Sequence, residues 1–334
     1  MKYEPLWKYC NTGQWKEMIL LLELLDRRKW PDDKYLACLY AISNHSERHY
    51  RMIQIPKRDK TLRCLYEPDF ILKQIQKNIL HHVLESLPVS SYALAYRKGT
   101  GIKANASCHI HKVVVVKLDI ENFFDHVMFP MVIKAAFPAE YFPMPVRTLL
   151  THLCCYKERL PQGAPTSAAI SNLVMKPFDE YIGNWCRERD IVYSRYCDDI
   201  TCSGSFKPQL VIRKIAACLQ EMGFYINERK TAVVRQGQRQ IVTGITVNEK
   251  ARVPLEYRRS LRQEIYYLKK YGATSHLQLA GDCRFKPYDD AGIHKYLQSL
   301  LGKINFILYI NPGDAFFKDS LVWLKEYLNH TIIP

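Results

Sequence analysis

The most constraining feature of this chain is the segment Tyr196-Cys197-Asp198-Asp199, which lies between two short apolar runs. Ile191-Val192-Tyr193 precedes it, and Ile200-Thr201-Cys202 follows and ends at Ser203-Gly204. Two β-branched runs this close together predict a β-hairpin with a tight turn. Adjacent carboxylates repel each other, so an acidic pair at such a turn suggests a bound cation. For the pair alone, a solvent-exposed turn without a ligand is the commoner interpretation.

A third carboxylate, Asp119, ends the continuous apolar run Val113–Leu118, which predicts a buried strand. A sheet that places this strand beside the acidic hairpin would create an oxygen-rich site. Carboxylate oxygens are ligands that Mg²⁺ prefers, and two such ions serve in-line phosphoryl transfer. The sequence therefore predicts a two-metal site built from Asp119, Asp198 and Asp199.

Charge and cysteine usage narrow the class of protein. The 334 residues include 48 Lys and Arg against 33 Asp and Glu, a formal net charge of +15. This surplus predicts a surface that binds a polyanion, and the 22 tyrosines offer rings on which bases can stack. The alternative is a basic protein without a nucleic-acid partner. The eleven cysteines include no CxxC pair, which argues against a zinc ribbon or a redox dithiol. Their odd number and mostly apolar neighbours favour reduced thiols and a cytoplasmic protein.

Apolar periodicity predicts the order of the elements. The first 48 residues favour helices, and a period-two pattern predicts a strand over Tyr50–Lys57 with a hairpin partner over 60–66. Between about 105 and 250 strands alternate with helices, and we expect one of these strands at Phe224–Ile226. Beyond Pro254 only helices are predicted. The N-terminus has no signal-peptide pattern, and no apolar run is long enough to cross a membrane.

A proline and a glycine force a tight loop at Leu160-Pro161-Gln162-Gly163, where the Gln162 amide can read a base or sugar edge. Taken alone, this loop before a helix is interpreted as structural. The order apolar strand with Asp119, then Leu-Pro-Gln-Gly, then Tyr-Cys-Asp-Asp resembles the palm motifs of reverse transcriptases. As a set these motifs are highly specific, and the resemblance covers about residues 48–312.

This resemblance implies an α+β, right-hand polymerase fold with RNA-directed DNA polymerase activity. Its parts would be fingers, a palm with a ferredoxin-like sheet, and a C-terminal helical thumb. The limits we expect are 1–48 for an N-terminal helical extension, 49–112 for the fingers (with 130–170 shared by fingers and palm), 113–250 for the palm and 251–334 for the thumb.

The resemblance also implies roles for individual residues. The three aspartates would be catalytic and, with Ile120 beside Asp119, would hold two Mg²⁺ ions, for which Mn²⁺ could substitute. The nucleotide-binding residues would be Lys57, Arg63, Phe124 and Gln162. The two cations would bind the triphosphate, Phe124 would exclude a 2′-hydroxyl, and Gln162 would contact the nascent base pair. The alternatives are surface charges for the cations and a core aromatic for Phe124.

Two shorter motifs resemble retron reverse transcriptases in particular. They are Asn105-Ala106-Ser107-Cys108-His109 and the run Gln240–Asn248 followed by Tyr257-Arg258-Arg259. The nucleic-acid-binding residues implied by this resemblance are Asn105, His109, Thr243, Gly244, Arg258, Arg259 and Arg262. For His109, a structural role inside the protein is the favoured alternative.

A retron enzyme would copy part of a cognate structured noncoding RNA into branched multicopy single-stranded DNA, primed from an RNA 2′-hydroxyl, in anti-phage defence. The implied partners are that RNA, its RNA–DNA product, dNTPs and a separate effector protein, with no membrane. The alternatives are another prokaryotic reverse transcriptase (group II intron-derived, CRISPR-associated or abortive-infection type) or a non-catalytic RNA-binding protein on a polymerase scaffold. One departure is Cys197, where the family usually has Ala, Met or Val; a small apolar cysteine is compatible with activity.

Overall fold

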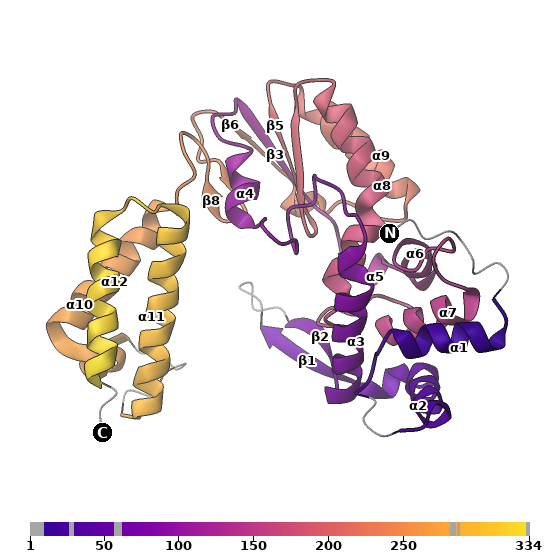
Figure 1. Ribbon diagram of the computed structural model, residues 1–334. Coiled ribbons are helices and arrows are strands. Elements are labelled where there is room, and N and C mark those ends of the chain that lie inside the picture. The colour runs from indigo at the N-terminus through magenta and orange to yellow at the C-terminus, as the bar shows by residue number, and fades with distance from the viewer. Residues whose placement is uncertain (1–9, 27–29, 57–61, 281–284, 286–287, 332–334) are drawn as a thin grey trace. The chain divides into compact units, whose positions relative to one another are not determined.

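The computed structural model describes residues 10–26, 30–56, 62–280, 285 and 288–331 (Figure 1). These residues form two compact units. The first comprises the chain up to Gly101 together with Val114–Val233, and the second comprises Ile102–Val113 together with the chain from Val234 onward.

A four-stranded sheet in the order β4-β5-β3-β6 lies at the centre of the first unit. Strand β3 (Val114–Asp119) pairs antiparallel with β5 (Asp199–Gly204), and β5 pairs antiparallel with β4 (Val192–Tyr196). Strand β6 (Ala232–Arg235) is the remaining edge. The valines of β3 are buried, as β-branched side chains in a central strand should be.

Two long helices contact this sheet. Helix α8 (Ser167–Arg187) contacts β4, and helix α9 (Pro208–Glu221) contacts β3. Proline in the first turn of α9 suits its start, and Gly223, with φ +81°, ends it in the left-handed conformation that glycine tolerates. The apolar sides of both helices face the core, which includes Ile170 and Ile215. The acidic hairpin and the alternation of strands with helices in this part of the chain were predicted from the sequence and are confirmed.

The remainder of the first unit is mostly helical. Strands β1 (Tyr50–Pro56) and β2 (Leu62–Pro68) pair antiparallel, which confirms the predicted hairpin for its described residues. The helices of this part are α1 (Thr12–Leu21), α2 (Asp32–Asn44), α3 (Phe70–His82), α5 (Phe123–His126), α6 (Phe129–Ala135) and α7 (Met144–Cys154). Helix α7 contacts α1, α2, α3 and α6, so it lies at the centre of this helical layer.

The second unit joins a short helix, a hairpin and three long helices. Helix α4 (Ile102–Ser107) contacts the hairpin of β7 (Ile241–Val242) and β8 (Ile245–Thr246). Helix α11 (Asp290–Ile310) contacts both α10 (Leu255–Ala280) and α12 (Ala315–Thr331). Helix α10 is interrupted at Gly272, whose φ of 75° and ψ of 168° are not helical. The prediction of helices alone beyond Pro254 is confirmed for the described residues.

One predicted strand is wrong. Of Phe224–Ile226, only Ile226 forms a bridge, an isolated antiparallel one to Ile120. The ladder ends there because a short 3₁₀ turn (Glu228–Lys230) follows at once. The sheet is instead extended by β6, which sequence patterning missed.

Candidate active site

The first unit brings the predicted acidic residues to one end of its sheet. Asp119 ends β3 and is the register partner of Asp199, the first residue of β5. Asp198 lies in the turn, and its carbonyl accepts a hydrogen bond of 3.0 Å from the amide of Ile120. Residues far apart in sequence therefore meet because β3 and β5 are neighbours, as the sequence predicts.

The turn that carries Asp198 has an unusual backbone. Its two central residues are Cys197 and Asp198, and only Cys197 has positive φ, +60°. Positive φ at the first central residue alone is typical of a type II′ turn, where glycine is usual. The thiol accepts a contact of 3.6 Å from the Tyr96 hydroxyl. Burial, together with the Asp198 charge, raises the pKa of Cys197 to about 12, so the thiol stays protonated.

The three carboxylates are electrostatically coupled. Burial raises the pKa of Asp119, while Lys230 opposes this shift because its Nζ donates to both carboxylate oxygens, at 2.9 and 3.0 Å. Asp199 is partly exposed to solvent. Even so, partial desolvation by the surrounding protein raises its pKa to about 6, and the negative charges of Asp198 and Asp119 add to this shift. The cluster is thus under repulsion, and Lys230 relieves part of it.

The donor chemistry of this cluster fits a hard cation. Carboxylate oxygens and a main-chain carbonyl such as that of Ile120 are the ligands Mg²⁺ prefers, and a cation would relieve the repulsion seen at Asp199. As arranged, the described residues contain no group of three or more His, Cys, Asp or Glu side chains placed to hold a metal ion. The metal site therefore stays a prediction.

The Gln162 loop is held against β2 by main-chain contacts. The Tyr66 amide donates to the Gln162 carbonyl at 2.8 Å, and the Ser167 hydroxyl donates to the Pro161 carbonyl at 2.6 Å. Gly163 has φ +122°, and a Cβ there would lie 3.1 Å from the Tyr66 carbonyl oxygen. Both the conformation and the close approach require glycine. The loop thus presents the half-buried Gln162 side chain from a fixed backbone.

The other residues expected to bind nucleotide lie on separate elements. Arg63 is exposed on β2, where a ligand can reach it. Phe124 is half-buried on α5, its ring 5.3 Å from that of Phe123. Lys57 lies outside the described residues. The nucleotide-binding roles stay predictions.

The second unit brings several of the predicted nucleic-acid-binding residues together. Thr243 and Gly244, with φ of 44° and 80°, form the turn of the β7–β8 hairpin. The Asn105 amide of α4 donates to the Thr243 hydroxyl at 3.4 Å. His109 is fully buried, and burial lowers its pKa to about 4, so it is neutral near pH 7. Its burial favours the structural alternative for His109.

The three predicted arginines lie on α10. Arg259 is exposed, whereas Arg258 donates from Nε to the Val253 carbonyl at 3.2 Å. The Arg262 guanidinium lies over the Phe316 ring, 5.1 Å from its centre, and 3.7 Å from Asp314. Contact with a nucleic-acid backbone stays a prediction for all three.

Residues 55–262 match the family described as reverse transcriptase (RNA-dependent DNA polymerase). The chain belongs to this family. Membership confirms the family expected from the palm motifs, and with it the α+β fold class of reverse transcriptases. All three aspartates, Arg63, Phe124 and Gln162 lie inside the matched region.

Several curated relatives are retron reverse transcriptases. The chain is 35% identical over 249 residues to the retron Mx65 reverse transcriptase of Myxococcus xanthus, covering 68% of this chain and 58% of that protein. It is 28% identical over 269 residues to the retron Ec86 reverse transcriptase of Escherichia coli, covering 79% and 83%. Among solved structures, a Candida tropicalis telomerase aligns with 63% of this chain and 55% of its own at 12% identity, with a TM-score of 0.46.

Sequence reasoning missed two residues that contact this acidic cluster or its turn. Lys230 contacts Asp119 directly, and Arg195, fully buried on β4, donates to the Cys197 carbonyl in the turn before Asp198. The available signal was an arginine within the predicted strand, immediately before the motif. In the part of the chain that the structure describes, no helix has the length and hydropathy needed to span a membrane.

Proposed function

We propose that this protein is the RNA-directed DNA polymerase of a retron. The observation that carries the proposal is the pairing of Asp119 with Asp199 across β3 and β5, with Asp198 in the adjoining turn, inside the matched family region. The retron assignment rests on the names of the relatives and on the two short motifs around Asn105 and Thr243. The substrates would be an RNA template and dNTPs.

The acidic cluster is proposed to hold two Mg²⁺ ions through the three aspartates and the Ile120 carbonyl, with Mn²⁺ as a substitute. Bound there, the ions would lower the pKa of the primer hydroxyl and offset charge on the departing pyrophosphate. Lys230 orients the Asp119 carboxylate through two hydrogen bonds and lowers the electrostatic cost of placing three acids together.

The incoming nucleotide is proposed to contact residues of the first unit. Arg63, with Lys57, would bind the triphosphate, since clustered cations bind phosphate oxygens. Phe124 would lie under the sugar and exclude a 2′-hydroxyl by steric contact. Gln162 would meet the nascent base pair, and the bond between its carbonyl and Tyr66 keeps the loop in place for that contact.

The second unit is proposed to bind the cognate noncoding RNA and its RNA–DNA product. Basic residues of α10 would contact phosphates, and the chain's net charge of +15 favours such contacts. The α4–hairpin assembly would contact nucleic acid at the Thr243–Gly244 turn, with Asn105 and His109 supporting it from inside. Synthesis would begin at an RNA 2′-hydroxyl and leave a branched molecule, with a separate effector acting in anti-phage defence in the cytoplasm.

Primer extension on an RNA template tests the polymerase activity. The wild type should extend a primer with Mg²⁺, and Asp198→Asn should lower the rate on the order of 10³-fold, because several kcal/mol of metal-based stabilisation are lost. Asp190→Asn is the matched control: it removes a carboxylate from the turn before β4, where φ of 56° suits asparagine. An inert wild type on every structured RNA would contradict the proposal and favour a non-catalytic RNA-binding protein.

Nucleic acid that copurifies with the protein tests the retron assignment. A retron enzyme should carry a branched RNA–DNA molecule that matches a noncoding RNA gene next to its own. Linear cDNA, or RNA from an intron or a CRISPR array, would instead indicate another prokaryotic reverse transcriptase.

A further inference from the structure

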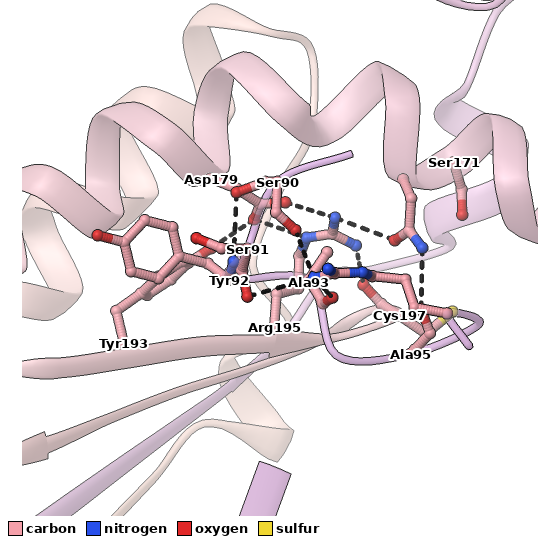
Figure 2. Close-up of polar contacts among 12 residues, drawn as sticks. Ser90, Ser91, Tyr92, Ala93, Ala95, Ser171, Asp179, Tyr193, Arg195 and Cys197 are labelled. Atoms are coloured by element: carbon pink, nitrogen blue, oxygen red, sulfur yellow. Dashed lines mark hydrogen bonds and ion pairs between the residues drawn. The ribbon is translucent and has the colours of Figure 1, made fainter. Parts of the chain in front are cut away.

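A buried polar network adjoins the turn at Cys197 (Figure 2). At its centre is Arg195 on β4, whose side chain has no exposed surface. Its Nε and Nη2 donate to the two carboxylate oxygens of Asp179 on α8, at 2.8 and 2.6 Å. Nη2 also donates to Asn172 Oδ1 at 3.2 Å, and Nη1 donates to the Cys197 carbonyl at 2.8 Å. The guanidinium thus links a helix to the turn that carries the acids.

Both ends of this link are fixed by further contacts. Asp179, also fully buried, accepts a hydrogen bond of 2.8 Å from the Tyr193 hydroxyl, and the Asn172 amide donates to the Ala95 carbonyl at 2.9 Å. The Arg195 main chain donates to the Tyr92 carbonyl and accepts from the Leu94 amide, both at 2.9 Å. A planar guanidinium held on several sides in a dry interior has one available orientation.

The hydrogen bond from Arg195 to the Cys197 carbonyl is made to the peptide group that joins Cys197 to Asp198. The Cys197 carbonyl belongs to the central peptide of the turn, the one that leads into Asp198. Types I′ and II′ differ by a flip of that peptide, which changes φ of the second central residue from positive to negative. The observed turn has positive φ at Cys197 and not at Asp198. A flipped peptide would send the Asp198 Cα–Cβ bond in a different direction.

We propose that Arg195, oriented by Asp179, is a positioning residue that holds the Cys197–Asp198 peptide in one orientation and so aims the acidic pair at the metal ions. This inference rests on the proposed function, because it concerns ions bound by the same aspartates. The fork of the guanidinium is the essential property, since a lysine keeps the charge but cannot bind Asp179 through two nitrogens and reach the Cys197 carbonyl as well.

A purely structural alternative is that the Arg195–Asp179 ion pair only attaches α8 to β4. Two variants separate the alternatives. Arg195→Lys keeps the buried charge and removes the fork. Tyr193→Phe removes a different hydrogen bond to the same Asp179 oxygen and leaves the contact with the Cys197 carbonyl intact. Both variants weaken the attachment of α8 to β4, but only Arg195→Lys removes the hydrogen bond to the Cys197 carbonyl in the turn.

Metal affinity is the readout that a structural role would not change. Mn²⁺ binding to each full-length protein, without nucleotide or nucleic acid, is measured by electron paramagnetic resonance of the free ion. The Mg²⁺ concentration for half-maximal primer extension is measured alongside. Arg195→Lys should need at least about tenfold more metal in both assays, as is common when a residue that orients a metal ligand is lost. Tyr193→Phe should match wild type within about twofold, although its urea midpoint falls.

Wild-type metal affinity in folded Arg195→Lys, or an equal loss of affinity in Tyr193→Phe, would overturn the inference. If Arg195→Lys does not fold, Asn172→Ala decides in its place. This variant keeps the ion pair, removes one bond that orients Nη2, and should raise the metal requirement about threefold or more. A wild type that binds Mn²⁺ but extends no primer would instead contradict the proposed function.

Discussion

The contact between Gly183 and Tyr92 offers a sharp test of how α8 packs. A Cβ built on Gly183 would lie 2.2, 2.4 and 2.5 Å from Cε2, Cζ and Cδ2 of the Tyr92 ring. Carbon atoms in contact normally lie about 3.5–4.0 Å apart, so the ring would have to move by about 1 Å or more. The Tyr92 ring also packs edge-on against the Tyr193 ring, with centroids 5.5 Å apart. Gly183→Ala therefore overpacks this layer.

The expected change in the free energy of unfolding of Gly183→Ala is the difference between a gain in helix propensity and a cost of overpacking. Alanine favours a helix interior over glycine by about 1 kcal/mol, whereas overpacking costs about 1–3 kcal/mol. We therefore expect Gly183→Ala to lower the free energy of unfolding by about 1 kcal/mol. The displacement should also reach β4, because the Tyr92 carbonyl accepts the Arg195 amide.

Urea unfolding followed by circular dichroism measures the effect, with two controls. Gly302→Ala makes the same change inside α11, where a Cβ would meet nothing within 4 Å, and it should stabilise by up to about 1 kcal/mol. In a Tyr92→Ala background the ring is gone, so Gly183→Ala should become stabilising by a similar amount. If Gly183→Ala stabilises the otherwise wild-type chain as much as it stabilises Tyr92→Ala, the packing argument is refuted.

Two further predictions concern His109 and Gly163. The folded chain holds His109 near pKa 4 against 6.5 for an ordinary histidine, so the unfolded chain gains a proton as pH falls below 6.5 while the folded chain stays neutral. Stability is therefore lost on acidification, by about 2 kcal/mol between about pH 8 and about pH 5 in urea titrations, and His109→Asn should lack that component. Gly163→Ala should lower primer extension about tenfold or more, because strain and the Tyr66 contact displace the Gln162 loop. Gly237→Ala, also at positive φ but with nothing within 4 Å of its Cβ, should keep full activity; equal losses in the two variants would assign the effect to strain alone.

Local sequence patterns were enough to predict most of the helices and strands and the protein family. The β-branched runs on either side of Tyr196–Asp199 predicted the hairpin, and the continuous apolar run before Asp119 predicted its neighbour strand. These features depend on residues close together in sequence, where periodicity reports directly on which face is buried. The strand expected at Phe224–Ile226 failed because the chain makes one bridge, from Ile226 to Ile120, and then enters the 3₁₀ turn at Glu228–Lys230.

The chemistry around the acids was decided by packing between distant segments. Lys230 reaches Asp119 because the 3₁₀ turn after α9 returns to the end of β3, a contact that no local pattern encodes. Likewise, Arg195 could be read from sequence only as a charge in a strand. Its burial against Asp179, and its hold on the Cys197 carbonyl, exist only once α8 covers β4.

The sequence by itself therefore determined that this chain carries the acidic motifs of the reverse transcriptase family and the strands that present them. The tertiary structure alone decided which side chains hold those acids in place. The physical reason is that strand and turn propensities are local free energies, whereas the orientation of a carboxylate depends on hydrogen bonds and excluded volume from segments that meet only in the folded core.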